Sequence, residues 1–222
     1  GIGFVDSASG LYVARNSGAG PETLTQIDTT VGLTGISAFE NADTGLTDLV
    51  AFSPTDVIVG RSLGDGTFAT VAALTSTEIR SAVGADVNGD DTMDIVVAHG
   101  VVEVLYGNGD ATWSDPETVV DSGFDAPTLA AEDLDHDGDD DIVVSETVGV
   151  PQLVAYAATT TDGLTSFESA TMSSPLIPAV SLIARDLNGD QLPEVVAVQG
   201  VAIIGSGNAQ SVDAVGGGIA LY

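Results

Sequence analysis

Short apolar runs alternate with Gly- and Asp-rich turns along most of the chain. Clear examples are "DIVVAHG" at 94–100 and "DIVVSE" at 141–146, where valine and isoleucine follow directly on acidic residues. β-Branched residues favour strands, and runs this short have the length of strands rather than of helices. The spacing of the runs and turns therefore predicts an all-β chain.

The runs belong to a repeating unit. The segments "DVNGDDTMDIVV", "DLDHDGDDDIVV" and "DLNGDQLPEVVA" begin at Asp86, Asp133 and Asp186, and a weaker copy, "ENADTGLTDLVA", begins at Glu40. Each copy lies between apolar stretches and is followed by a further strand, a Gly/Asp turn with an aromatic residue, and a last strand. Four strands in a unit of about 45 residues is the pattern of a propeller blade. We therefore predict a β-propeller built of four-stranded antiparallel blades.

The repeats divide the chain into five units of one predicted propeller domain or segment. Full blades are expected at 33–75, 79–120 and 125–172, a partial blade at 1–28, and a last blade, which need not be complete, at 178–222. The opening at Gly1 without a leader indicates a mature product, a fragment or an excised domain. Unless the N-terminal strands complete the last blade, both ends present open edges that can pair with another chain, for example in a filament.

Aromatic residues recur at fixed places in the units. Tyr12, Tyr106, Tyr156 and Tyr222 fall on the third strand of their units, where Val59 takes the same place. We expect these residues to pack between blades, as aromatic residues of a repeated strand usually do. The same expectation applies to Phe68, Trp113 and Phe167, for which stacking on sugar rings is the alternative.

The acidic loops carry the candidate chemistry. Counting from Asp133, side-chain oxygens stand at positions one, three, five and nine, position seven offers a backbone carbonyl, and Gly138 permits a sharp bend. Alternate positions of a tight turn can converge on one point, and an all-oxygen, highly negative set suits Ca²⁺ better than Zn²⁺, copper or Mg²⁺. An EF-hand is excluded, because its last ligand is at position twelve and a helix follows it.

The predicted Ca²⁺ ligands form about three sites. They are Asp86, Asn88, Asp90, Thr92 and Asp94; Asp133, Asp135, Asp137, Asp139 and Asp141; and Asp186, Asn188, Asp190, Leu192 and Glu194. The copy at Glu40 keeps only Glu40 and Asp48, so it is the weakest candidate. Plain turn formation is the alternative reading of such Asp- and Gly-rich stretches. The threefold recurrence of one ligand spacing favours metal binding.

These motifs, with "LGDGTF" and "GNGDATW" after them, resemble the FG-GAP/VCBS-type repeats of integrin α-chain propellers and many microbial, including marine, surface proteins. The resemblance covers the chain from about Leu33 onward. It implies that Ca²⁺ binds between the first two strands of each blade, through side chains one, three, five and nine. Family propellers usually have seven blades, more than this sequence supplies. One fold of this kind hosts adhesins, lectins and enzymes, so the resemblance does not define an activity.

The net charge of the chain limits the classes of partner that it can bind. The chain has 33 acidic residues against four arginines, a formal net charge of −29, and no cysteine. Such a surface repels nucleic acid and anionic lipid, and no apolar stretch is long enough to span a membrane. Disulfides and thiolate metal sites are excluded. His99 and His136 are expected to be solvated loop residues, and no nucleophile motif accompanies them.

The sequence therefore predicts a calcium-binding propeller module of a secreted or cell-surface protein. We expect a structural or adhesive role, with a protein or glycan ligand and self-association as possible partnerships. A carbohydrate-binding lectin is the first alternative, and a polysaccharide-active enzyme on the same scaffold is the second.

Overall fold

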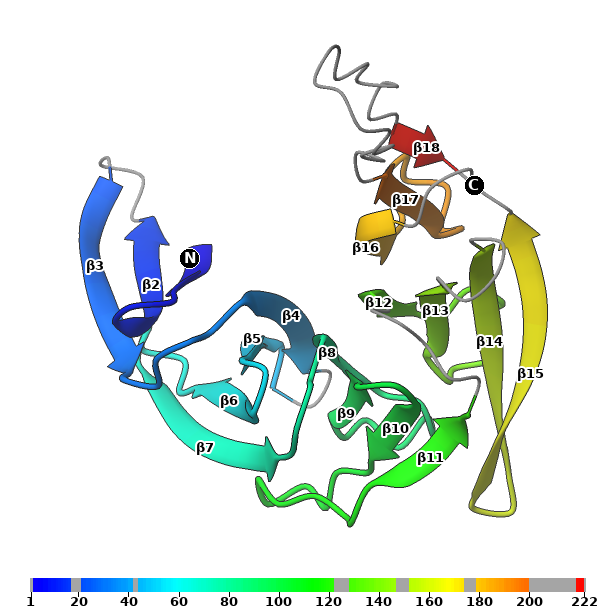
Figure 1. The fold of residues 1–222 in the computed structure, drawn as a ribbon, viewed down its shortest axis with the longest axis horizontal. Coiled ribbons are helices and arrows are strands. Elements are labelled where there is room, and N and C mark those ends of the chain that lie inside the picture. Colours follow the sequence, from blue (N-terminus) through cyan, green and yellow to red (C-terminus); the bar gives the residue numbers. More distant parts are fainter. Residues whose placement is uncertain are drawn as a thin grey trace, which may run out of the picture.

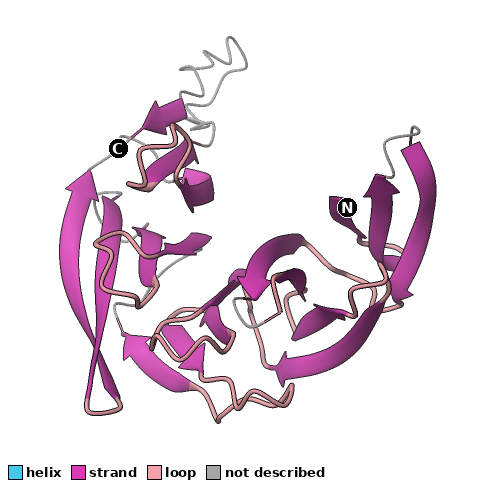
Figure 2. Cartoon of the chain, turned by 180° about the vertical axis from the view of Figure 1, so that it is seen from behind, coloured by secondary structure: helices cyan, strands magenta, loops and turns pink. Residues whose placement is uncertain are grey.

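The computed structural model describes residues 2–16, 21–41, 44–121, 128–146, 152–173, 179–199 and 219–221. The described residues form five antiparallel sheets and no helix (Figure 2), so the all-β prediction is confirmed. Strands that follow one another in sequence pair with one another in every sheet. None of these residues lies in a helix long and apolar enough to cross a membrane.

The first two sheets contain the strands up to residue 75. The first sheet consists of β1 (Ile2–Asp6), β2 (Gly10–Asn16) and β3 (Pro21–Asp28). The second consists of β4 (Gly35–Asn41), β5 (Leu46–Phe52), β6 (Asp56–Ser62) and β7 (Phe68–Thr75).

The remaining sheets continue the same order. The third is β8 (Ser81–Ala85), β9 (Asp94–Ala98), β10 (Val102–Leu105) and β11 (Glu117–Val120). The fourth is β12 (Thr128–Glu132), β13 (Asp141–Glu146), β14 (Gln152–Thr161) and β15 (Leu164–Ser173). The fifth is β16 (Ala179–Arg185), β17 (Glu194–Gln199) and β18 (Ile219–Leu221).

The five sheets follow one another along an open arc (Figure 1). The first strand of each four-stranded sheet lies on the inner side of the arc and the last strand lies on the outer side. β8 contacts both β4 and β12, and β12 contacts β16, so the inner strands are neighbours. Four-stranded antiparallel sheets stacked in this way are consistent with the blades of a propeller.

Apolar layers between neighbouring sheets form the core. On β9, Ile95 and Val97 face the second sheet, whereas Val96 and Ala98 face the fourth. All of β9 is therefore buried. A strand buried on both faces needs apolar residues at successive positions, because alternate side chains point to opposite faces. This explains why the second strand of each unit reads as a continuous apolar run.

The aromatic residues support these layers. Tyr156 lies in the layer between the third and fourth sheets, and Tyr106 and Phe167 pack against it. Trp113 packs against the layer between the second and third sheets, where Val59 is fully buried. Packing therefore accounts for these side chains, as expected. Tyr12 lies on β2, and Tyr222 lies outside the described residues.

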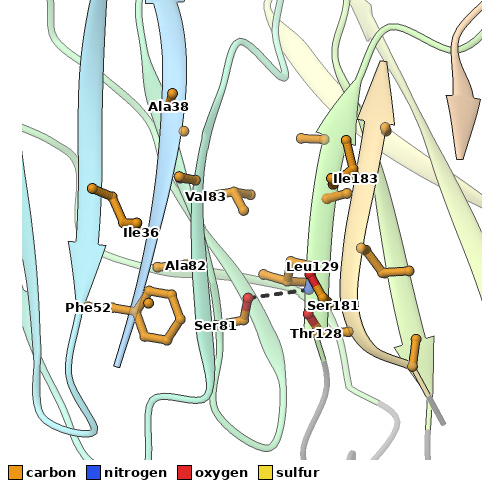
Figure 3. Close-up of a pocket in the computed structure, with 18 of the residues that line it drawn as sticks. Ile36, Ala38, Phe52, Ser81, Ala82, Val83, Thr128, Leu129, Ser181 and Ile183 are labelled. Atoms are coloured by element: carbon orange, nitrogen blue, oxygen red, sulfur yellow. Dashed lines mark hydrogen bonds between the residues drawn. The ribbon is translucent and has the colours of Figure 1, made fainter. Parts of the chain in front are cut away.

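A cavity of about 910 Å³ runs along the inner strands (Figure 3). Its walls are mostly small and apolar side chains of β4, β8, β12 and β16, including Ile36, Val83 and Ile183. The hydroxyl of Ser81 on β8 accepts a hydrogen bond from the Leu129 N–H on β12 at 3.3 Å. This bond links two sheets across the inner side of the arc.

Candidate metal-binding loops

The three acidic loops join the first strand of a sheet to the second. They connect β8 to β9, β12 to β13, and β16 to β17. In each loop the carboxylate at position one accepts two backbone N–H groups. Asp133 accepts those of His136 at 2.6 Å and Gly138 at 3.1 Å. Asp186 accepts those of Gly189 and Gln191 at 2.6 and 2.9 Å. The first acidic residue thus holds the turn around itself.

Asp86 also accepts two backbone N–H groups, but the first donor is at position five and not at position four. Its two carboxylate oxygens accept the N–H groups of Asp90 at 3.1 Å and Asp91 at 2.8 Å. Two backbone donors stabilise the ionised form of a carboxylate. For the exposed Asp186, such bonds lower the pKa below its usual value. For Asp86, half-burial outweighs them and raises the pKa.

Positions four and six adopt positive φ in all three loops. The residues are Gly89 and Asp91 (φ 63° for both), His136 and Gly138 (63° and 98°), and Gly189 and Gln191 (83° and 74°). Glycine enters this region without a steric penalty, whereas other residues do so at some cost. The predicted bend at Gly138 is thus confirmed. The left-handed conformation of His136, an exposed residue, was not foreseen from the sequence.

Positions three and five continue the turn. The carboxylate of Asp135 accepts the N–H of Asp137 at 3.2 Å, and that of Asp137 accepts the N–H of Asp139 at 3.0 Å. Equivalent bonds link Asn88 to Asp90 and Asp90 to Thr92 in the first loop, and Asn188 to Asp190 and Asp190 to Leu192 in the last. The side chains at positions three and five therefore each hold the backbone N–H two residues further along the loop.

Position nine is the first residue of the second strand and is buried in the first two loops. Asp141 accepts the N–H of Leu134, at position two, at 3.0 Å and that of Ala158, on β14, at 2.9 Å. Asp94 does the same with Val87 at 3.1 Å and Gly107 at 2.7 Å. One carboxylate thus connects its own loop with the third strand of the sheet, or with the residues just after that strand.

Glu194, with a longer side chain, is less buried and bonds differently. It accepts the N–H of Leu187 at 2.9 Å and the side-chain amide of Asn188 at 2.6 Å. The same amide group also donates to Asp190 at 3.1 Å. The positive end of the Asn188 amide dipole therefore lies between two carboxylates, which is the place that a cation would take.

Three carboxylates converge in the loop from 133 to 141. Asp133, Asp135 and Asp141 each offer an oxygen, and these atoms all lie within 4.8 Å of one another. Ca²⁺ binds oxygen at 2.3–2.6 Å, so two ligands on opposite sides of one ion are roughly 5 Å apart. The residues present fit a single calcium ion. Asp137 is not among these three.

Burial, together with the crowding of like charges, raises the pKa of two position-nine carboxyls, Asp94 and Asp141. Burial is the main cause, and the neighbouring carboxylates add to it. The pKa of Asp94 rises to about 7, with Asp90 and Asp86 contributing, and that of Asp141 rises to about 6, with Asp135 and Asp133 contributing. A cation at either loop would favour the ionised forms, because it replaces repulsion by attraction.

The residues at position seven of the loops, Thr92, Asp139 and Leu192, are the remaining predicted ligands. Asp139 is buried, and its carboxylate accepts the N–H of Thr160 on β14. The backbone N–H groups of Thr92 and Leu192 take part in the turns described above. Ligation by the carbonyl of position seven stays a prediction for all three residues.

The copy at Glu40 has a different role. Residues 42–43 lie outside the described part, and Glu40 is exposed on β4. Asp48 is nevertheless buried, and it accepts the N–H of Ser62, on β6, at 2.7 Å. Asp48 therefore keeps the strand-linking function of position nine although positions three and five are Ala42 and Thr44.

The structure also assigns partners that the sequence did not indicate. Asp140 accepts the N–H of Asp86 at 2.8 Å and so joins two loops. His99 is not a solvated loop residue: it is largely buried, and its Nε2 lies 2.7 Å from Oε2 of Glu103 on β10. The first contact joins the loops of two neighbouring sheets, and the second joins the turn after β9 to β10.

Comparison with known proteins agrees with this architecture. A solved lectin of Agrocybe aegerita, described as recognising non-reducing terminal N-acetylglucosamine, superposes with a TM-score of 0.58 at 21% identity. The match covers 86% of this chain and 55% of the lectin, so this chain spans little more than half the lectin's length. At this identity the likeness concerns the fold, which is propeller-like. No curated protein matches the chain.

The repeats themselves are recognised as well. The family model of the FG-GAP-like repeat matches residues 42–97 and again residues 86–144. These segments contain two of the three good acidic loops and the copy at Glu40. Residues 42–144 therefore consist of FG-GAP-like repeats, which confirms the resemblance predicted from the sequence.

Proposed function

We propose that the protein is a calcium-binding propeller module of a secreted or cell-surface protein, with a structural or adhesive role. The convergence of Asp133, Asp135 and Asp141 on one point is the observation that carries this proposal. The recurrence of the same turn at 86–94 and 186–194 extends it to about three ions. FG-GAP-like repeats in residues 42–144 support it.

Each residue of a loop has a defined part in the proposed site. Positions one, three, five and nine supply side-chain oxygens, and position seven supplies a carbonyl oxygen. A bound Ca²⁺ would neutralise the crowded carboxylates and crosslink the start of the loop to the buried strand. Millimolar extracellular Ca²⁺ is sufficient for sites of modest affinity. The role is therefore stabilisation of the sheet stack at the end that carries the loops.

Metal analysis and thermal unfolding test the proposal. About three Ca²⁺ per chain and a fall in Tm on chelation are expected, because a ligand that binds only the folded state stabilises it by mass action. Asp133→Asn, at a position that is Asp in all three loops, should remove about one ion. Asp121→Asn removes the same charge from an exposed position outside the loops and should remove none. Absence of bound metal together with an unchanged Tm would refute the proposal.

Carbohydrate binding is a second candidate, supported by the likeness to the lectin fold. Trp113 is a poor stacking platform, because its ring packs against the core and its indole N–H donates to the Met93 carbonyl at 3.1 Å. A glycan array probed with the Ca²⁺-loaded protein, including terminal N-acetylglucosamine, tests this candidate. Binding that survives Trp113→Leu would assign the sugar to another surface, and no binding by the wild type would reject the candidate.

A further inference from the structure

Two of the acidic loops, from neighbouring sheets, contact each other through Asp140. This residue occupies position eight of the loop from 133 to 141. Its backbone N–H donates to the Asp86 carbonyl at 2.7 Å, and its carboxylate accepts the Asp86 N–H at 2.8 Å. Both backbone groups of the first ligand residue in loop 86–94 are thus held by one residue of the next sheet.

A second contact joins the same two loops at Gly89. A methyl group on this residue would lie 2.5 Å from Oδ1 of Asp139 and 3.1 Å from the Gly138 carbonyl. Both distances are shorter than ordinary van der Waals contact. The loops therefore approach each other so closely that only glycine fits at position four of the first one.

Asp140, at position eight, links the conformations of the two loops. Asp140 stands between Asp139 and Asp141, the predicted ligands at positions seven and nine. An ion bound by loop 133–141 would fix both neighbours and hence Asp140 itself. Asp140 in turn fixes the backbone of Asp86, from which the carboxylate at position one projects. Order imposed on one loop therefore lowers the entropic penalty of ordering the other.

We propose that Asp140 is a positioning residue for the neighbouring loop, and that loops 86–94 and 133–141 bind Ca²⁺ cooperatively. This inference rests on the proposed function and adds the coupling of its sites. Linkage requires the effect to be reciprocal: an ion in either loop raises the affinity of the other by the same factor.

The third loop provides an internal control. Its position eight is Pro193, which has no N–H to donate and no carboxylate to accept. The hydrogen-bonded pair made by Asp140 with Asp86 is therefore impossible between Pro193 and Asp133. Loop 186–194 should fill independently of the other two.

Electrostatic repulsion between ions opposes this coupling and must be separated from it. A first Ca²⁺ reduces the negative potential that attracts a second one, so the Coulombic contribution to coupling is negative. In about 1 M NaCl the Debye length is about 3 Å, and this contribution is largely screened. The contact through Asp140 persists, so the cooperativity should be clearest at high salt.

Trp113 reports on one of the loops alone. It is the single tryptophan of the chain, and its indole N–H donates to the carbonyl of Met93, the residue that precedes Asp94. Filling of loop 86–94 should change its fluorescence. Tb³⁺ luminescence sensitised by the same ring is a second readout, because the energy transfer is short-ranged.

The experiment is a Ca²⁺ titration of Trp113 fluorescence in 1 M NaCl. Asp137→Asn disables loop 133–141, and Asp190→Asn makes the same charge change in loop 186–194. Asp137→Asn should raise the Kd reported by Trp113 about fivefold or more, within the usual range of coupling between sites. Asp190→Asn should change it less than twofold. Melting curves verify that each variant is folded.

Variants of Asp140 complete a double-mutant cycle. Asp140→Ala should raise the reported Kd and remove the further effect of Asp137→Asn, whereas Asp140→Asn keeps an oxygen acceptor and should retain much of the coupling. Equal effects of Asp137→Asn and Asp190→Asn, with three ions still bound by equilibrium dialysis, would overturn the coupling alone. No bound Ca²⁺ in dialysis would overturn the proposed function as well.

Discussion

The carboxylate of Asp48 accepts the backbone N–H of Ser62 at 2.7 Å, in the repeat that has Ala42 and Thr44 at positions three and five. Asp141 makes the equivalent bond to the third strand of its sheet, and Asp94 makes it to Gly107, just after the third strand of its own. In these three sheets the residue at position nine therefore serves as a hydrogen-bond acceptor for the backbone, whether or not it binds a metal. Its role in metal binding depends on whether the rest of the loop supplies oxygens.

Asp48→Ala should destabilise the protein equally with and without Ca²⁺. The substitution leaves the partly buried Ser62 N–H without its acceptor, which costs about 1 kcal/mol. Urea unfolding in chelator and in excess Ca²⁺ measures the change. Glu40→Ala, at an exposed position of the same repeat, should stay within about 0.5 kcal/mol of the wild type. A destabilisation by Asp48→Ala that appears only with Ca²⁺ would instead place an ion at this loop.

Gly89→Ala should destabilise the protein more than Gly189→Ala. Both glycines occupy position four of a loop with positive φ, so both substitutions add backbone strain of about 1 kcal/mol. Only at Gly89 does the new methyl group meet another loop, 2.5 Å from Asp139, whereas the space around Gly189 is open. Chemical denaturation of the two variants compares them directly. Equal losses would contradict the close approach of the two loops.

The metal-free protein should become more stable as the pH falls from about 7.5 to 5.5. Burial raises the folded-state pKa of Asp94 to about 7 and that of Asp141 to about 6, above the unfolded value of about 3.9. In this window the folded state binds more protons than the unfolded state, so the free energy of unfolding falls as the pH rises. Urea unfolding in metal-stripped buffers measures the slope.

Saturating Ca²⁺ should reverse that trend. The bound ion requires ionised carboxylates, so protons compete with it as the pH falls through the same range. The Ca²⁺-induced rise in Tm should therefore shrink between pH 7.5 and 5.5. A stabilisation by Ca²⁺ that is constant across this range would show that Asp94 and Asp141 take no part in binding.

Val143→Ala should be far more damaging than Val198→Ala. Val143 is fully buried between the fourth and fifth sheets, and loss of two methyl groups there costs about 2 kcal/mol. Val198, on β17, is 41% exposed. Its substitution should change the free energy of unfolding by less than about 1 kcal/mol. Similar losses at both positions would indicate that the fifth sheet is covered in solution.

Local regularities made much of this protein predictable. The runs of valine after each acidic loop indicated strands, and β9 and β13 are found there with their apolar side chains buried. The spacing of one, three, five and nine placed Asp133, Asp135 and Asp141 around one point, as the structure finds. Both follow from periodicity within a single segment, where neighbouring residues determine the geometry.

The contacts between segments could not be predicted in this way. Asp140 has the same residue type as its neighbours, yet it faces Asp86 of another sheet rather than its own loop. Asp48 retains the acceptor role of position nine because Ser62 lies close to it on β6, the strand that pairs with β5. His99 is largely buried against Glu103 because β9 and β10 are paired.

The division between the two kinds of information has a physical basis. The sequence by itself determined the all-β class, the repeat and the ligand pattern, because strand burial and turn geometry depend on side chains a few residues apart. Only the tertiary structure decided which carboxylates hold backbone N–H groups and which loops touch. Those depend on how successive sheets stack, and hydrogen bonds across that stack join residues with no fixed separation along the chain.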